Sequence, residues 1–253
     1  MGPACRPGTA ALAAGVIGLT IVLALRGVAQ MPATAGDAEE AGPLIGSRVR
    51  AWYRALLAPF EDRFVAWRVH PDALTWAQLA VSLLAGVAFW RGVVFLAGWL
   101  TILAGTLDIL DGGVARRTGI AGPRGAFVDS VIDRWAEFAT FAGLGAFFRD
   151  GWMLAVVALA AFGSFMVSYT RARAEGLGID LRLGSAQRPE RYLILGTGAW
   201  LSSVVVHLTC GVGGRPSHGV LAAAVVVLAA VACWTAVQRA RHAVRVLRAG
   251  GGR

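Results

Sequence analysis

The chain has 253 residues, of which 57% are hydrophobic, and its mean hydropathy is +0.62. Soluble domains are about 45–50% apolar, so these values indicate an integral membrane protein. The formal net charge is +9, but the arginines alternate with long apolar runs, which argues against nucleic-acid binding. The three cysteines are widely spaced and odd in number, so neither a disulfide framework nor a cysteine metal site is expected.

The first feature in chain order is an uncharged apolar stretch at residues 8–25. It is typical of a signal sequence or of an additional membrane span. Cleavage would place the following segment outside the cell, against the arginine distribution described below. We therefore favour an extra span with its N-terminus outside, or translation that begins at Met31. The polar segment at residues 31–46 has the composition of a flexible linker.

Residues 48–68 combine arginines with large apolar side chains at helical spacing. This pattern predicts an amphipathic helix that lies on the membrane surface. A soluble helix packed on cytoplasmic loops is the alternative interpretation of the same pattern. The apolar members are Trp52, Tyr53, Leu56, Leu57, Phe60, Phe64 and Trp67.

Six apolar runs follow, each close to the roughly 20 residues that a helix needs to cross about 30 Å of hydrocarbon. Short polar connections separate them, so we expect one all-α integral membrane bundle of six transmembrane helices, preceded by the juxtamembrane helix. The predicted domains are a leader or extra span with linker, the main membrane domain and a flexible basic tail, at residues 1–47, 48–247 and 248–253. The six runs cover approximately residues 73–90, 92–111, 125–148, 151–170, 192–210 and 219–237.

Arginines are distributed very unevenly between the two ends of this predicted bundle. One end carries 18 of them and the other carries three. Because basic residues are retained on the cytoplasmic side, both ends of the six-span body are expected in the cytoplasm. The sequence therefore predicts a multi-pass protein of the cell membrane.

Four aspartates occur where the second and third predicted spans meet the arginine-rich side. Asp108 and Asp111 end the second span, and Asp129 and Asp133 lie in the first turns of the third. Carboxylates at membrane depth cost several kcal/mol unless they are paired, hydrated or bound to a cation. At 100° per residue, the members of each pair share one helix face, so all four are expected to converge on a cavity open to the cytoplasm.

Four hard oxygen ligands without clustered histidine or cysteine favour Mg²⁺ or Mn²⁺. Two such ions a few Å apart could clamp a diphosphate and stabilise a displacement at phosphorus. Gly112 and Ala115 share the face of Asp108 and leave room for a ligand, and Arg116 supplies a cation nearby. A carboxylate-lined cation transporter is the competing interpretation.

The segment from Asp108 to Asp133 resembles the signature of the CDP-alcohol phosphotransferase (CDP-alcohol phosphatidyltransferase) family at every defined position. The matching positions are Asp108, Asp111, Gly112, Ala115, Arg116, Gly125, Asp129 and Asp133. The resemblance implies that Asp108, Asp111 and Asp129 hold the metal ions and that Asp133, which can also contact metal, is the general base. It further implies a CDP-diacylglycerol donor, release of CMP, membrane lipid as a partner and a homodimer.

A second segment, His70 to Thr75, resembles the opening of the first span in that family. The resemblance implies contacts between the CDP moiety and several residues of both segments. Gly122 departs from the inositol-phosphate-using relatives, which often have a hydroxyl residue there. The residues assigned to the CDP-lipid are Pro71, Asp72, Ala73, Leu74, Gly112, Ala115, Arg116 and Gly125.

The C-terminal half resembles the phosphatidylinositol phosphate synthases and the archaetidylinositol counterparts in three places: residues 168–175, 188–191 and 238–239. The resemblance implies that Arg171, Arg191 and Arg239 bind the phosphate of inositol phosphate, with Arg171 at a place where lysine is common. Arginines from three helix ends would suit a dianion. Glycerol 3-phosphate or another alcohol stays open as the acceptor, although the third span lacks the Asp-Pro form common in glycerophosphate-using relatives.

Overall fold

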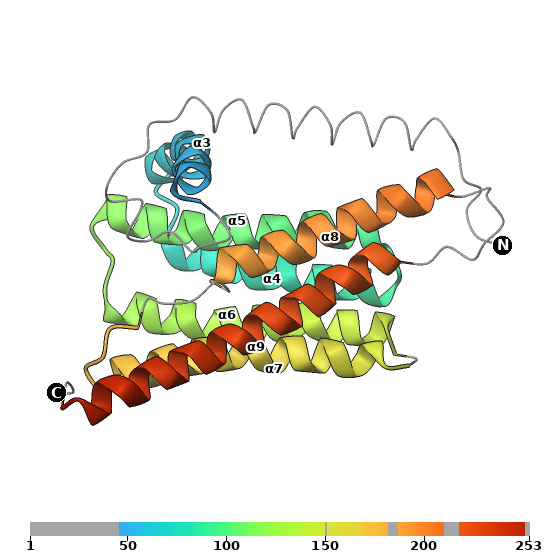
Figure 1. Cartoon of the computed structure of the whole chain (residues 1–253). Helices are drawn as coiled ribbons and strands as arrows, with labels where there is room; N and C mark the ends of the chain where they lie inside the picture. The colour runs from blue at the N-terminus through green and yellow to red at the C-terminus, as the bar shows by residue number, and fades with distance from the viewer. Residues whose placement is uncertain (1–45, 150, 182–186, 210–217, 251–253) are drawn as a thin grey trace.

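The computed structural model describes residues 46–149, 151–181, 187–209 and 218–250. Apart from turns and short connections, these ranges form seven α-helices, as the all-α prediction requires (Figure 1). The predicted leader and linker up to residue 45 and the last three residues of the tail lie outside the described residues. The helices are α3 (Ser47–Ala66), α4 (Pro71–Trp90), α5 (Val94–Thr118), α6 (Pro123–Phe147), α7 (Met153–Glu175), α8 (Arg188–Thr209) and α9 (Gly219–Arg248).

Local sequence signals set the helix ends that surround the aspartates. Pro71 is the first residue of α4, where a missing N–H leaves no helical bond unmade. The ring nitrogen Nδ1 of His70 accepts a hydrogen bond from the Asp72 N–H at 3.3 Å and caps this helix. α5 is followed by Gly119, whose φ of 71° lies in the left-handed region that glycine tolerates, and α6 begins at Pro123. A short turn therefore joins the two helices that carry the aspartate pairs.

Close approach of the helices depends on glycines at their crossings. A Cβ atom on Gly143 of α6 would overlap the backbone of Gly86 in α4. Likewise, a Cβ on Gly98 of α5 would lie 2.9 Å from the carbonyl oxygen of Gly196 in α8. Small residues at such crossings let helices pack in lipid without a hydrophobic driving force. These contacts set how closely α4 approaches α6 and how closely α5 approaches α8.

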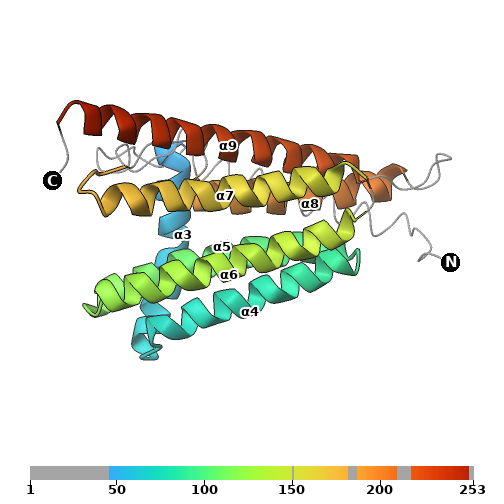
Figure 2. The same cartoon turned by 90° about the horizontal axis from the view of Figure 1, so that it is seen from below.

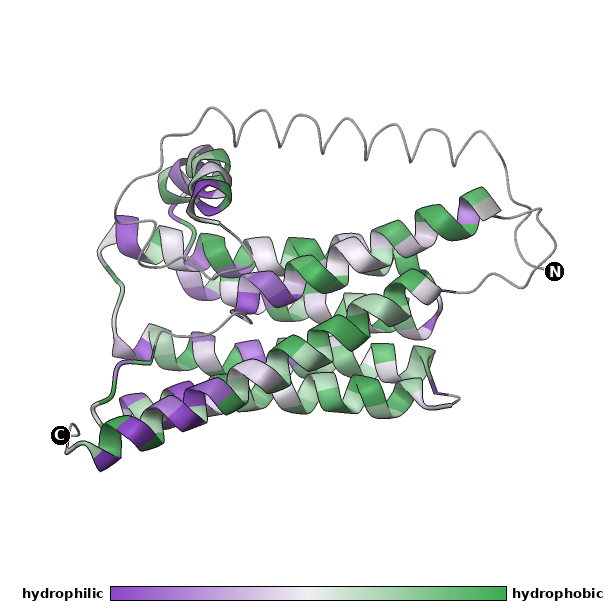
Figure 3. Cartoon of the chain, viewed as in Figure 1, coloured by the Kyte–Doolittle hydropathy of each residue, from purple (hydrophilic) through white to green (hydrophobic). Residues whose placement is uncertain are grey.

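Hydrophilic residues gather at one end of the bundle, where α5, α7 and α9 end and α4, α6 and α8 begin (Figure 3). The apolar core lies away from that end and draws residues from all six helices α4 to α9, among them Phe89, Phe141 and Leu195. Four helices of the described chain, α4, α5, α7 and α9, are long and apolar enough to cross a membrane. The other two helices of the bundle, α6 and α8, run beside these four (Figure 1).

α3 crosses the polar end of the bundle at a steep angle to the other helices (Figure 2). Polar contacts attach it to α5: Tyr53 Oη lies 2.6 Å from Thr106 Oγ1, and Arg117 pairs with Glu61, at 2.7 Å between Nε and Oε2, and with Asp62. The predicted helix at residues 48–68 is thus present. Its exposed large apolar residues are Val49, Leu56 and Phe60.

Candidate active site

The four predicted aspartates come from two adjacent helices, α5 and α6. Carboxylate oxygens of Asp108, Asp129 and Asp133 lie within 4.8 Å of one another. Asp111 is turned toward α4 instead, and its Oδ2 accepts a hydrogen bond from Thr75 Oγ1 at 2.7 Å. Three carboxylates therefore form one cluster, while the fourth lies on an adjoining cavity that Asp129 also lines.

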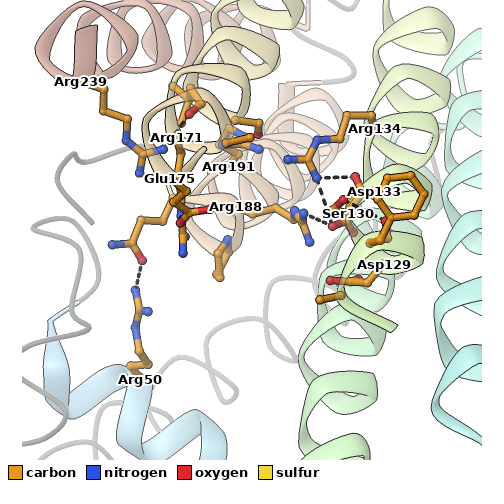
Figure 4. Close-up of a pocket in the computed structure, with 17 residues that line it drawn as sticks. Arg50, Asp129, Ser130, Asp133, Arg134, Arg171, Glu175, Arg188, Arg191 and Arg239 are labelled. Carbon is orange, nitrogen blue, oxygen red and sulfur yellow. Dashed lines mark hydrogen bonds and ion pairs between the residues drawn. The ribbon is translucent and has the colours of Figure 1, made fainter. Parts of the chain in front are cut away.

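Two residues that the sequence did not assign hold Asp133 from neighbouring helices. Gln78 of α4 is fully buried, and its Nε2 donates a hydrogen bond to Asp133 Oδ1 at 3.0 Å. Arg188 of α8 donates to Asp133 Oδ2 (Figure 4) and also, at 2.5 Å, to Asp108 Oδ1. Arg188 lies three residues before Arg191, in a segment whose resemblance pointed to Arg191 only. Gln78 is a polar residue within an apolar run, a signal of a buried polar role.

The aspartate cluster has the ligand chemistry that a divalent cation requires. Asp129 Oδ1 is buried and has no hydrogen-bond partner among the described residues. A buried carboxylate oxygen without a partner costs free energy, which a bound cation would recover. One carboxylate oxygen of Asp129 lies within 4.8 Å of oxygens of Asp108 and Asp133, and such oxygens are hard ligands suited to Mg²⁺ or Mn²⁺. The residues present therefore fit a metal ion.

The first of two cavities beside the cluster, about 420 Å³, opens between the start of α4, the end of α5 and the start of α6. A Cβ on Gly125 would meet no atom within 4 Å, so the space beside that glycine is open. Asp72 and Arg124 form an ion pair of 3.0 Å between the first turns of α4 and α6. The predicted CDP-lipid residues that line this cavity are Pro71, Asp72, Gly112, Ala115, Arg116 and Gly125.

The other two predicted CDP-lipid residues lie away from this cavity. Ala73 is exposed and does not belong to its lining. Leu74 is buried in a small apolar cluster with Leu57, Leu110 and Val114. The first turn of α4 therefore presents one side to the cavity and the other side to α3 and α5. A sequence motif does not show which of its residues lies on which side.

The second cavity, about 790 Å³, lies on the other side of the cluster, between α6, α7, α8 and α9 (Figure 4). Asp129 and Asp133 belong to its wall, so it shares Asp129 with the first cavity. Its positive charge comes from five helices. The arginines that line it are Arg50, Arg134, Arg171, Arg188, Arg191 and Arg239.

All three arginines predicted to bind the acceptor line this second cavity, in different settings. Arg191 is buried, and its Nε and Nη2 donate to the two carboxylate oxygens of Glu137 at 2.7 and 3.3 Å. Arg239 is also buried, and its Nη1 donates to a backbone carbonyl of α7 at 2.7 Å. Arg171 is half exposed and pairs with Glu175 at 2.7 Å. A cavity that concentrates guanidinium groups next to carboxylates suits a small phosphorylated molecule with a reactive hydroxyl.

Comparison with known proteins identifies the region that contains this site. The family model for CDP-alcohol phosphatidyltransferase matches residues 68–234. The match therefore includes both aspartate pairs, the first cavity and most of the second. It leaves out α3 and the end of α9, which contribute Arg50 and Arg239 to the second cavity.

Curated relatives and solved structures give the same family. A phosphatidylinositol phosphate synthase of Cutibacterium acnes is 32% identical over 57% of this chain and 72% of its own length. An archaetidylinositol phosphate synthase of Methanothermobacter thermautotrophicus is 32% identical over 76% of this chain and 91% of its own. The Mycobacterium tuberculosis phosphatidylinositol phosphate synthase with CDP-DAG bound has a TM-score of 0.63 at 27% identity, covering 73% of this chain and 92% of that one. The same enzyme in complex with manganese and citrate gives a TM-score of 0.62 at 26% identity, covering 73% of this chain and 87% of that one.

Proposed function

This chain belongs to the CDP-alcohol phosphatidyltransferase family, and we propose that it transfers the phosphatidyl group of CDP-diacylglycerol to inositol phosphate. It is a transferase of phospholipid synthesis. The proposal rests mainly on the arginine-lined cavity that adjoins the aspartate cluster. The names of the relatives, and the related structure that holds CDP-DAG, support the same donor and acceptor.

We assign Asp133 as the general base. A hydroxyl of the acceptor gives its proton to Asp133, and the oxygen forms a bond to the β-phosphorus of the donor as the bond from that phosphorus to CMP breaks. CMP leaves with the bonding electron pair, and the proton on Asp133 passes to solvent. Gln78 and Arg188 orient the Asp133 carboxylate between the two substrates. The rate enhancement comes chiefly from this positioning together with neutralisation of charge.

Asp108, Asp111, Asp129 and Asp133 are the proposed metal ligands, for two ions of Mg²⁺ or Mn²⁺. Bound there, the ions would neutralise the diphosphate and the departing CMP. A related structure in complex with manganese supports a divalent cation as the metal. Asp111 joins the set from the first cavity, where it lies beside Asp129 in the lining.

The two cavities give the two substrates separate places. We propose that the lining residues of the first cavity contact the CDP group, with Leu74 supporting them by packing and Ala73 making no contact. Arg171, Arg191 and Arg239 bind the acceptor phosphate in the second cavity. The shared wall at Asp129 then brings the acceptor hydroxyl and the β-phosphorus together.

We propose that α4 to α9 are the six membrane spans, with the polar end and the site facing the cytoplasm. The arginine count of the sequence supports this orientation, as does the polar end in Figure 3. α3 would then lie along the membrane surface, because it crosses the spans (Figure 2). The domain of residues 48–247, the leader and the homodimer stay predictions from the sequence.

CMP release by purified protein tests the function. The protein receives CDP-diacylglycerol and Mg²⁺ with inositol 1-phosphate, glycerol 3-phosphate, free inositol or serine in separate reactions. We expect release with inositol 1-phosphate. Release with glycerol 3-phosphate alone would replace the acceptor and keep the chemistry. No release with any of the four, from folded protein, would require a wider panel of acceptors before the transporter interpretation is reconsidered. Turnover by an Asp133→Asn protein would contradict the assignment of the base.

A further inference from the structure

Arg50 lines the second cavity although it lies outside the region that matches the family. It belongs to α3, the helix that crosses the polar end of the bundle. Figure 4 shows its side chain extending from α3 toward the opening, on a different side from Arg171 and Arg239. The aspartates Asp129 and Asp133 lie across that opening. Arg50 therefore adds a cation from a direction that the family domain alone does not supply.

Hydrogen bonds hold both Arg50 and the residue that it contacts. Its Nη2 donates a hydrogen bond to Gln187 Oε1 at 3.0 Å. Gln187 precedes α8, and its backbone N–H donates to Oε2 of the buried Glu190 at 2.9 Å. The next residue is Arg188, which binds Asp108 and Asp133. α3 itself is attached to α5 through Tyr53 and Glu61, as described above.

We propose that Arg50 is a further acceptor-binding residue, so that α3 forms one wall of the acceptor site. This inference rests on the proposed function, because it assigns Arg50 to the phosphorylated polyol of that reaction. A guanidinium has five N–H donors in a planar fork. Arg50 can therefore keep its bond to Gln187 while it donates to a phosphate or hydroxyl oxygen of the acceptor.

Four variants of the full-length protein test the proposal. Arg50→Gln removes the charge, and Arg50→Lys keeps the charge but loses the fork. Gln187→Met keeps Arg50 but removes the side-chain amide that accepts its hydrogen bond and that also lines the cavity. Arg48→Gln is the matched control, because Arg48 is exposed on the same helix and does not line the cavity. Inositol 1-phosphate binding is measured by calorimetry, and KM values for both substrates and kcat are measured by CMP release.

We expect Arg50→Gln to weaken inositol 1-phosphate binding by about tenfold or more, the usual effect of losing a charge-assisted hydrogen bond. Its KM for the acceptor rises correspondingly, and its KM for CDP-diacylglycerol and its kcat stay near those of the wild type. Arg50→Lys restores part of the affinity, and Arg48→Gln and Gln187→Met bind nearly as well as the wild type.

Equal binding by wild type and Arg50→Gln would overturn the inference alone. A full loss in Gln187→Met would also overturn it, because Arg50 would then act only by holding α8. If the wild type itself does not bind inositol 1-phosphate, the proposed acceptor fails, and the assignment of Arg50 fails with it.

Discussion

The hydrogen bond from Gln78 to Asp133 can be removed without leaving a hole in the bundle. Gln78 is fully buried in α4, and its Nε2 lies 3.0 Å from Asp133 Oδ1. A carboxylate only accepts hydrogen bonds, so the amide NH₂ must face Asp133. The opposite atom, Oε1, is buried without a hydrogen-bond partner among the described residues. Methionine has a similar volume and flexibility, so Gln78→Met removes both polar atoms and keeps the packing.

The effects of this change on stability and on catalysis should differ. Removal of the unsatisfied Oε1 recovers about 1–3 kcal/mol of desolvation cost, whereas loss of a hydrogen bond to a charged group costs about 1.5–3 kcal/mol. The two contributions oppose each other in the free energy of unfolding. In catalysis there is no such compensation, because the oriented Asp133 carboxylate must receive the acceptor proton. If the lost bond is felt fully in the transition state, kcat falls about 10- to 100-fold.

The measurement is kcat from CMP release at saturating substrates, with the melting temperature recorded in the same detergent. Tyr192→Phe is the control, because its hydroxyl lies 3.5 Å from the same Nε2 and the variant leaves the bond to Asp133 in place. We expect Tyr192→Phe to retain most activity. A wild-type kcat in Gln78→Met would refute the reasoning, and so would a loss of stability large enough to account for the lost activity.

Three further predictions concern a buried ion pair, a glycine crossing and the metal ions. Glu137→Ala should lower the free energy of unfolding by about 3–5 kcal/mol, because it leaves the buried Arg191 without its carboxylate. Glu175→Ala breaks the exposed pair with Arg171 and should cost about 1 kcal/mol or less. Chemical denaturation measures both changes. Gly143→Ala should lower the free energy of unfolding by about 1–3 kcal/mol, because the added Cβ would overlap the backbone of Gly86. Gly125→Ala should unfold like the wild type, because its Cβ meets no atom, but it should raise the KM for CDP-diacylglycerol. Removal of the metal by a chelator should abolish CMP release. Asp129→Asn should need at least about tenfold more Mn²⁺ to reach half of its full activity, and Mn²⁺ binding measured by electron paramagnetic resonance should weaken to the same extent.

The sequence predicted the helical elements well because hydropathy and length report directly on membrane helices. Each of the six apolar runs falls largely within one of the helices α4 to α9, and residues 48–68 overlap α3. The polar ends were underestimated: α9 continues to Arg248, whereas its apolar run ends near residue 237. Hydropathy marks the part of a helix that lipid surrounds, but backbone hydrogen bonding continues into water.

The site was predictable only as far as single helices determine it. Helical periodicity put each aspartate pair on one face, and three of the four carboxylates do meet. The contacts of Asp111 with Thr75 and of Asp133 with Gln78 depend on how α4 is rotated against α5 and α6. That rotation follows from the packing of the helices, which no pattern along one helix contains. The same reason explains why Leu74 packs in the small apolar cluster with Leu57 and Leu110 and does not line the first cavity.

The geometry of the site therefore depends on the packing of the bundle. Asp108, Asp133, Gln78 and Arg188 come from α5, α6, α4 and α8, and each contact between them crosses a helix interface. The glycine crossings at Gly86 with Gly143 and at Gly98 with Gly196 set two of those interfaces. Since packed helices transmit small shifts, we expect a methyl group at a crossing to displace side chains at the polar end. Substitutions far from the aspartates should consequently lower activity in step with their effect on helix packing, unlike Gln78→Met, which separates the two.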